Sequence, residues 1–159
     1  MEEMGARKVV VGLDHSEQSL YALQWALENL VDSDLGDNIV LLHSQPQSYV
    51  FRPFVGLGVS FASEFEHLLN KYQDESLQKI LEQAKNLCVE NRVEAKTHVV
   101  HGDPRDTVCD IVNEMNADVL VMGSHGDSCP SIRRAFLGSV CDFCAHNARC
   151  PVLIVKKTP

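Results

Sequence analysis

The stretch KVVVGLDHSEQSLYALQWALENLV, residues 8–31, holds one complete strand-helix unit. Residues 8–13 form a β-branched apolar run, which predicts a short buried strand ending just before Asp14. Leucines then recur at spacings of three and four residues: Leu20, Leu23, Leu27 and Leu30. This spacing predicts an amphipathic helix. A strand that leads directly into such a helix is the repeating unit of an α/β fold.

The same alternation continues to the end of the chain. Apolar runs predict four further strands, at residues 38–44, 93–100, 117–123 and 150–155. Helical patterns separate them. One begins at Ser63, one begins at Pro104 with Asp103 as its N-cap, and the last covers residues 139–147. Residues 45–62, which are rich in proline and glycine, are predicted to form a long loop.

This order of elements determines the expected fold class. Consecutive strands that alternate with helices need crossover connections, and these build a parallel sheet with helices on both faces. The run at residues 117–123 is continuously apolar, as expected for a strand covered on both faces. We therefore expect an α/β fold: a doubly wound, five-stranded parallel sheet in a single domain over residues 1–159.

The composition excludes several classes of function. The 159 residues, 45% of them hydrophobic, suffice for one well-buried core. The formal net charge is -8 and no Lys/Arg-rich run occurs, which argues against a nucleic-acid groove. No segment approaches the roughly 20 apolar residues that a membrane span requires. We expect a cytoplasmic protein with no membrane span and with reduced cysteines, and leave nuclear or membrane-associated pools open.

In an open parallel sheet, ligands bind outside the carboxyl ends of the strands, so the residues that follow each strand are the candidates. After the first strand, a dinucleotide-binding unit would show G-x-G-x-x-G, and GLDHSE does not. NAD is therefore disfavoured. Asp14 can accept hydrogen bonds from ribose hydroxyls or an adenine amino group, or it can serve as an N-cap or first-turn acid of the following helix.

After the fourth strand comes VMGSHGDSCPSIRRAFLGSV, residues 121–140. Gly123, Gly126 and Gly138 permit close approach of a ligand to the backbone. Gly138 and Ser139 directly precede a predicted helix, whose free N–H groups attract phosphate, and Ser139 can either cap that helix or bind a phosphate oxygen. No G-K-[ST] sequence occurs, so a Walker A loop is excluded. His125 has no recognisable nucleophile partner and is interpreted as a binding residue.

These motifs together resemble the universal stress protein family, particularly its single-domain plant members. The resemblance rests on VVVGLDHSEQSLYALQWAL, NIVLLHS, HGDPRDTVCDIVNEMNADVLVMGSHG and RRAFLGSVCDFCAHNARCPVLIVKK, and it covers nearly the whole chain. It implies a Rossmann-like fold of the adenine nucleotide alpha hydrolase type.

The family's nucleotide-binding branch carries G-x-x-G, nine residues, then G-[ST]. Here Gly123 to Gly126 and Gly138-Ser139 match both ends, but the intervening segment, residues 127–137, is two residues longer than the pattern. We place the two additional residues in DSCPS, residues 127–131, and this departure from the pattern weakens the case for nucleotide binding.

The resemblance implies a binding site for ATP or AMP. The residues it assigns to adenosine or to the ribose and phosphates are Gly12, Leu13, Asp14, Ser44, Met122, Gly123, His125, Gly126, Gly138, Ser139 and Val140. A magnesium ion would be held mainly by the nucleotide, because the sequence shows no dedicated cluster of metal ligands. We expect neither a catalytic residue nor a protein-held metal.

Three functions fit this interpretation. The first is a nucleotide-binding module that regulates a stress response or signalling as a homodimer formed through the last strand, an edge strand. The second is a slow ATPase on the same scaffold. The third is a non-binding protein that acts by dimerisation or as a chaperone, which the longer segment 127–137 would favour.

Two cysteines and one histidine invite other readings. Cys141-x-x-Cys144 could belong to a metal or redox site, but it lacks a second separated pair of ligands, so helix packing is favoured. His43 lies on a predicted strand among apolar neighbours, which predicts a neutral core histidine with a satisfied hydrogen bond.

Overall fold

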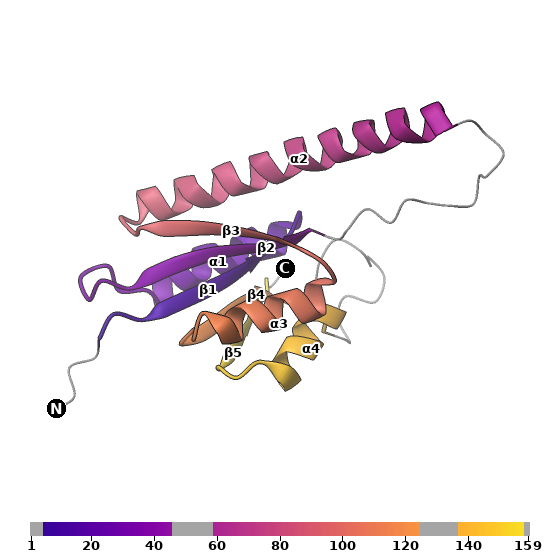
Figure 1. The fold of residues 1–159 in the computed structure, drawn as a ribbon. Helices are drawn as coiled ribbons and strands as arrows, with labels where there is room; N and C mark the ends of the chain where they lie inside the picture. Colours follow the sequence, from indigo (N-terminus) through magenta and orange to yellow (C-terminus); the bar gives the residue numbers. More distant parts are fainter. Residues whose placement is uncertain (1–4, 46–58, 125–136, 158–159) are drawn as a thin grey trace.

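The computed structural model describes residues 5–45, 59–124 and 137–157, and in them strands and helices alternate as predicted (Figure 1). The strands are β1 (Lys8–Leu13), β2 (Asn38–Gln45), β3 (Ala95–His101), β4 (Val119–Gly123) and β5 (Val152–Val155). The helices are α1 (Glu17–Asn29), α2 (Val59–Glu90), α3 (Pro104–Glu114) and α4 (Ser139–Asn147). No helix within these ranges combines the length and the hydropathy needed to cross a membrane.

The five strands form one parallel sheet in the order β3-β2-β1-β4-β5. Strand β1 is central, with Val10 opposite Val40 of β2 on one side and opposite Leu120 of β4 on the other. The chain builds outward from β1 to β3 and then crosses back to place β4 beside β1. The strand order therefore reverses between β1 and β4, which is where open α/β sheets bind ligands.

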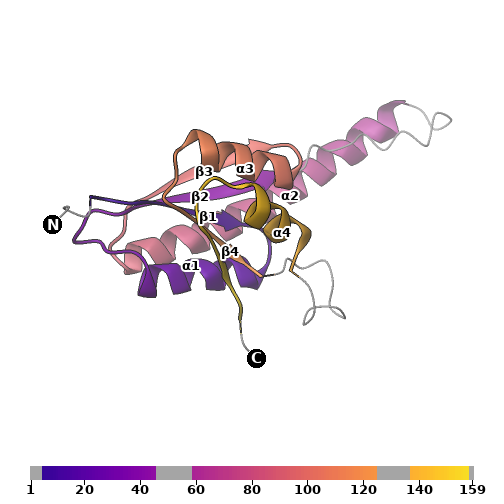
Figure 2. The same cartoon turned by 90° about the horizontal axis from the view of Figure 1, so that it is seen from below.

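Helices cover both faces of the sheet, as predicted (Figure 2). Side chains alternate in direction along a strand, so Val9 and Val11 of β1 pack with α1 and α2, while Val10 packs with α3 and α4. Both sets are fully buried. The continuous apolar runs in the sequence arise because each central strand contributes to two cores.

The helices begin where short polar side chains can cap them. Ser16 caps α1 by accepting from Ser19 N at 3.2 Å. Asp103 caps α3 by accepting from Arg105 N at 2.9 Å, with Pro104 in the first turn, as predicted. Helix α4 differs: its N-cap is Gly138, without a side-chain cap, and Ser139 is the first helical residue. The interpretation of Ser139 as N-cap is therefore wrong.

The long helix α2 departs from the sequence prediction in two ways. It begins at Val59, so the last four residues of the predicted loop 45–62 are helical, and residues 46–58 lie outside the described part of the chain. Leu68 and Tyr72 follow the apolar spacing of this segment, which predicts that they face the core, yet they are 63% and 76% exposed. A helix of 32 residues is about 48 Å long, whereas a strand of eight residues spans about 26 Å. Its first half consequently extends beyond the sheet (Figure 1).

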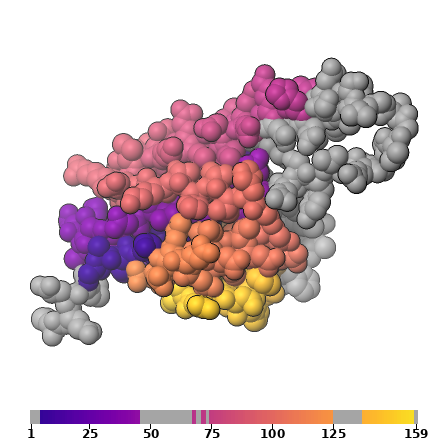
Figure 3. All heavy atoms as spheres, in the orientation of Figure 1, coloured from indigo at the N-terminus to yellow at the C-terminus, as the bar shows by residue number. Residues whose placement is uncertain are grey.

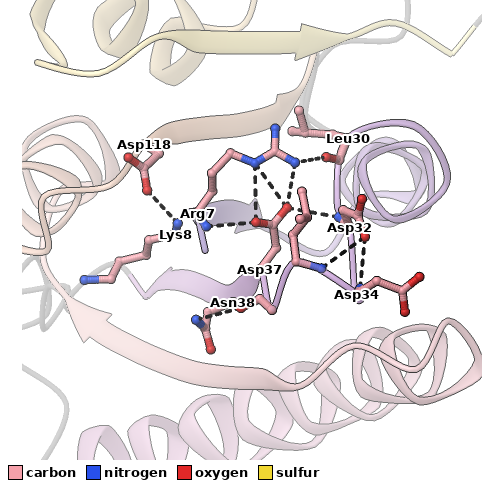
Figure 4. Close-up of polar contacts among 10 residues, drawn as sticks. Arg7, Lys8, Leu30, Asp32, Asp34, Asp37, Asn38 and Asp118 are labelled. Atoms are coloured by element: carbon pink, nitrogen blue, oxygen red, sulfur yellow. Dashed lines mark hydrogen bonds and ion pairs between the residues drawn. The ribbon is translucent and has the colours of Figure 1, made fainter. Parts of the chain in front are cut away.

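An ion pair between partly exposed Arg7 and buried Asp37 joins the amino end of β1 to the connection between α1 and β2 (Figure 4). The Asp37 carboxylate accepts from Arg7 Nη2 at 2.6 Å, from Arg7 Nε at 3.1 Å and from Arg7 N at 2.8 Å. It also accepts from Asp32 N at 3.0 Å, and Arg7 Nη2 donates to Leu30 O at 2.7 Å. Residues 30 positions apart in the chain are thereby joined at the end of the sheet opposite to the candidate site.

Candidate nucleotide site at the carboxyl ends of β1 and β4

The last residues of β1 and β4 lie next to each other at the candidate site. Gly12 of β1 faces Met122 of β4: a Cβ added at Gly12 would lie 3.6 Å from Met122 Cγ, an ordinary contact. Leu13 and Met122 are both buried. The backbone of β1 thus arrives at the switch point beside the end of β4, with Asp14 as the first residue beyond the strand.

Asp14 is held in place by the first turn of α1. Its Oδ1 accepts from Ser16 N at 2.8 Å and from the Ser16 hydroxyl. The Ser19 hydroxyl accepts from Asp14 N at 3.2 Å, which fixes the backbone. Among the residues that the structure describes, both carboxylate bonds use Oδ1, so Oδ2 is free to accept from a ligand. Ser16 caps the helix, which leaves the Asp14 side chain available for binding.

The two glycine ends of the motif after β4 meet in space. Gly138 N donates to Ser124 O at 3.0 Å, and Cys141 Sγ donates to Gly123 O at 2.9 Å. Ser124 N is itself tied to Val155 O of β5 at 3.0 Å. Gly123 and Gly138 therefore lie close together, although fourteen residues separate them in the chain. His125 and Gly126 lie outside the described residues.

Helix α4 begins near the end of β4, where Cys141 Sγ donates to Gly123 O, and Gly123 in turn faces Gln18 in the first turn of α1. Burial raises the pKa of Cys141 to about 11, and the negative charge of Asp14 contributes to this rise. The N-terminal N–H groups of a helix have no partners within the helix and attract anions. Gly138 supplies no capping side chain, Ser139 is exposed and Val140 is half-buried. The Asp14 carboxylate and the N-terminus of α4 therefore both lie at the carboxyl end of the sheet.

Ser44 lies on the other side of β1, near the end of β2. Its Oγ is 2.7 Å from Thr107 Oγ1, which in turn donates to Asp103 O at 2.8 Å. Because a hydroxyl has one proton, Ser44 is the donor to Thr107, and its lone pairs can still accept. Ser44 therefore joins β2 to the start of α3.

His43 of β2 holds the last residue of β1 through a hydrogen bond. It is 3% exposed, and its Nδ1 lies 2.8 Å from Leu13 O, the last carbonyl of β1. Burial lowers the pKa of His43, and nearby His15 lowers it further, although the Leu13 carbonyl opposes the change. The ring is therefore neutral near pH 7 and donates from Nδ1. This confirms the prediction of a neutral, hydrogen-bonded core histidine.

Gly123 makes its close approach to the protein itself. A Cβ at this position would lie 2.8 Å from both C and O of Gln18 in α1, which is far below a permissible contact. The sequence suggested that this glycine admits a ligand. In the structure it admits the first turn of α1, and so determines how closely Asp14 and Ser16 approach β4.

Sequence reasoning missed three residues around the site. Ser16 and Ser19 orient Asp14, and Thr107 orients Ser44. Ser16 carried a signal, since a serine just before an apolar helical pattern is a preferred N-cap. Ser19 and Thr107 carried none, because their roles depend on contacts that only folding creates. Over residues 5–45, 59–124 and 137–157, no group of three or more potential metal ligands comes together.

A carboxylate that follows β1 and a helix that begins at the end of β4 lie at the switch point of an open parallel sheet, the position where α/β domains bind their ligands. Comparison with known proteins narrows this class. A sequence model of the universal stress protein family matches residues 5–156. The universal stress protein A-like protein of Arabidopsis thaliana is 31% identical over 137 residues, which make up 86% of this chain and 77% of that protein. The chain belongs to the universal stress protein family.

Solved structures share the fold. Protein MJ0577 of Methanocaldococcus jannaschii is similar with a TM-score of 0.75 at 24% identity, over 96% of each chain. A universal stress protein family protein from Arabidopsis thaliana, solved with AMP bound, is similar with a TM-score of 0.68 at 26% identity. That similarity covers 96% of this chain and 92% of the Arabidopsis chain. The Rossmann-like α/β class predicted from the sequence is confirmed.

Proposed function

We propose that this chain binds an adenine nucleotide, ATP or AMP, at the carboxyl ends of β1 and β4. The observation that carries the proposal is the hydrogen bond that Gly138 N donates to Ser124 O, with an N–O distance of 3.0 Å. It joins the two glycine ends although the segment between them is longer than the family pattern. The Arabidopsis relative with bound AMP supports the choice of ligand.

In this proposal, different residues bind different parts of the nucleotide. Asp14 Oδ2 accepts from a ribose hydroxyl, while the N–H groups in the first turn of α4 bind phosphate. The remaining contacts are proposed from Gly12, Leu13, Ser44, Met122, Ser139 and Val140, with His125 and Gly126 proposed from the sequence alone. Magnesium would bridge the phosphates of ATP and leave with them.

The proposed role is regulatory. Nucleotide occupancy changes which partners the protein contacts during a stress response, so the chain acts as a binding module. If ATP binds one conformation of the protein more tightly than another, that difference in affinity supplies the free energy for such a change. Hydrolysis is not required by this scheme, and it is tested by measuring phosphate release in the same samples.

Nucleotide affinity should depend on Asp14 and Gly138. We expect calorimetry to show saturable binding of ATP with magnesium, and of AMP without it, to the intact chain. Gly138→Val should abolish binding, because a branched side chain fills the space before the helix N-terminus. The φ of -59° at Gly138 is allowed for valine, so the fold should persist. Asp14→Ala should weaken binding about tenfold or more, as expected for the loss of a charge-assisted hydrogen bond.

Asp34→Ala is the matched control, since this exposed carboxylate lies in the connection between α1 and β2. It should bind as the wild type does. Absence of binding to folded wild-type protein would refute the proposal and favour the dimeric or chaperone-like alternative. Suppression of client aggregation, unaffected by ATP, would then be the measurement to make.

We also propose that the chain forms a homodimer through β5, which lies at the edge of the sheet. Leu120 N and Ser124 N donate to Pro151 O and Val155 O, so the intervening Val152 and Ile154 direct their backbone groups away from β4. Sedimentation should show a dimer at micromolar concentration. Ile154→Pro removes one outward donor and should shift the equilibrium to monomer. A strictly monomeric wild type would contradict this proposal.

A further inference from the structure

Two thiols from different helices meet in the core between α3 and α4. Cys109 Sγ of α3 lies 3.4 Å from Cys144 Sγ of α4. Their side chains are nearly inaccessible, at 5% and 0% exposure. The two helices lie side by side on one face of the molecule, where Figure 3 shows α3 in orange and α4 in yellow. Residues 35 positions apart are thus already close to bonding distance.

The structure also separates the Cys-x-x-Cys pair that the sequence singles out. Cys141 Sγ donates to Gly123 O at 2.9 Å, toward β4, whereas Cys144 Sγ is directed to Cys109. Both side chains belong to the buried core, as the helix-packing interpretation predicted. The neighbour of Cys144 for thiol chemistry is therefore Cys109.

We propose that Cys109 and Cys144 form a reversible disulfide that joins α3 to α4 when the protein meets hydrogen peroxide. One thiol, as thiolate, attacks a peroxide oxygen; the O–O bond breaks, and a sulfenic acid and water result. The second thiolate then attacks the sulfenic sulfur; the S–S bond forms, the S–O bond breaks, and the leaving hydroxide takes a proton to become water. Two thiols are oxidised to one disulfide, and one peroxide is reduced to two waters.

The geometry requires little rearrangement. A disulfide has an S–S length of about 2.05 Å, so the two sulfur atoms must approach by about 1.4 Å. Rotation of the two side chains with a small shift of α4 can provide this, since α4 is a short helix of nine residues. The bond would close a long loop and raise the melting temperature by several degrees.

Formation of this disulfide should be slow. Burial raises the pKa of both thiols, so the reactive thiolate is scarce. Cys88 is equally buried, and burial raises its pKa to about 11, but it belongs to α2 and packs in the other core. Cys88 therefore serves as a control for burial without a facing thiol among the described residues.

Peptide mapping tests the proposal without any variant. Folded protein is treated with millimolar hydrogen peroxide, the remaining thiols are alkylated, and the chain is digested with trypsin and Glu-C. Cys109 then falls in peptide 106–114, Cys129 in 115–133, Cys141 and Cys144 in 135–149, and Cys150 in 150–156. We expect a reducible link between 106–114 and 135–149. Cleavage before Asp142 with Asp-N assigns it to Cys144.

Variants and the melting temperature provide the second readout. Cys109→Ala and Cys144→Ala should each abolish the link and the rise in melting temperature, whereas Cys88→Ala should retain both. Alkylation of both Cys109 and Cys144 after peroxide treatment would overturn the proposal. So would a link through Cys141 or Cys150 instead, or a link that forms only in denaturant. None of these outcomes depends on nucleotide binding.

Discussion

Gly123→Ala should destabilise the protein by about 3 kcal/mol, at the upper end of what overpacking a core costs. The added methyl group would lie 2.8 Å from the Gln18 backbone, which cannot rotate aside as a flexible side chain can. The first turn of α1 must therefore move away from β4. Because that turn holds Asp14 through Ser16, nucleotide affinity should fall together with stability.

Gly12→Ala is the matched control for this prediction. It adds the same methyl group on the neighbouring strand, but the nearest atoms belong to the Met122 side chain, at 3.6 and 3.7 Å. We expect a change below about 1 kcal/mol. Urea unfolding followed by circular dichroism measures both variants. Equal stability of the two would show that α1 and β4 are not as tightly apposed as the structure indicates.

Asp37→Ala should destabilise the protein by about 2–4 kcal/mol, somewhat less than the roughly 3–5 kcal/mol expected for breaking a fully buried ion pair, because the Arg7 side chain is 32% exposed. The loss leaves the Arg7 guanidinium and the backbone N–H groups of Arg7 and Asp32 without their acceptor. Lys157→Ala is the control, because the exposed Lys157–Glu17 pair should contribute less than about 1 kcal/mol. Urea unfolding at pH 7 compares the two, and similar losses would contradict the prediction.

The pH dependence of stability should identify the same carboxylate. Burial alone would raise the pKa of Asp37, but hydrogen bonds from Arg7 and from the Asp32 and Arg7 backbone outweigh it and lower the pKa below 3.8. A lowered native pKa means that the contribution is complete above the unfolded value, near 3.9. It is lost as the pH falls through the native pKa. The free energy difference between wild type and Asp37→Ala should therefore shrink only below about pH 4.

Much of the fold could be predicted from the sequence because its signals are local. Strand β4 is continuously apolar, α1 repeats leucine at helical spacing, and Asp103-Pro104 predicted the start of α3 correctly. The face of α2 could not be predicted in the same way. Leu68 and Tyr72 follow the apolar pattern, yet the sheet beneath the helix ends before it reaches them.

In the candidate site, too, some features could be predicted from the sequence and others depend on tertiary packing. Asp14 and the glycine ends could be recognised in the sequence because they follow predicted strands. The bond between Gly138 and Ser124 could not, because the length of an intervening segment does not determine the distance between its ends. Nor could the approach of Gln18 to Gly123, which depends on the packing of α1 on β4.

By itself the sequence determined the order of strands and helices, the parallel α/β class and the segments that follow the strands, since short-range periodicity and capping specify these. Only the tertiary structure decided which distant residues meet: Arg7 with Asp37, Cys109 with Cys144, and Gly138 with Ser124. Such pairs lie many residues apart and leave no periodic signal in the chain. They come together because the crossover connections bring separate strand and helix ends to the same side of one sheet.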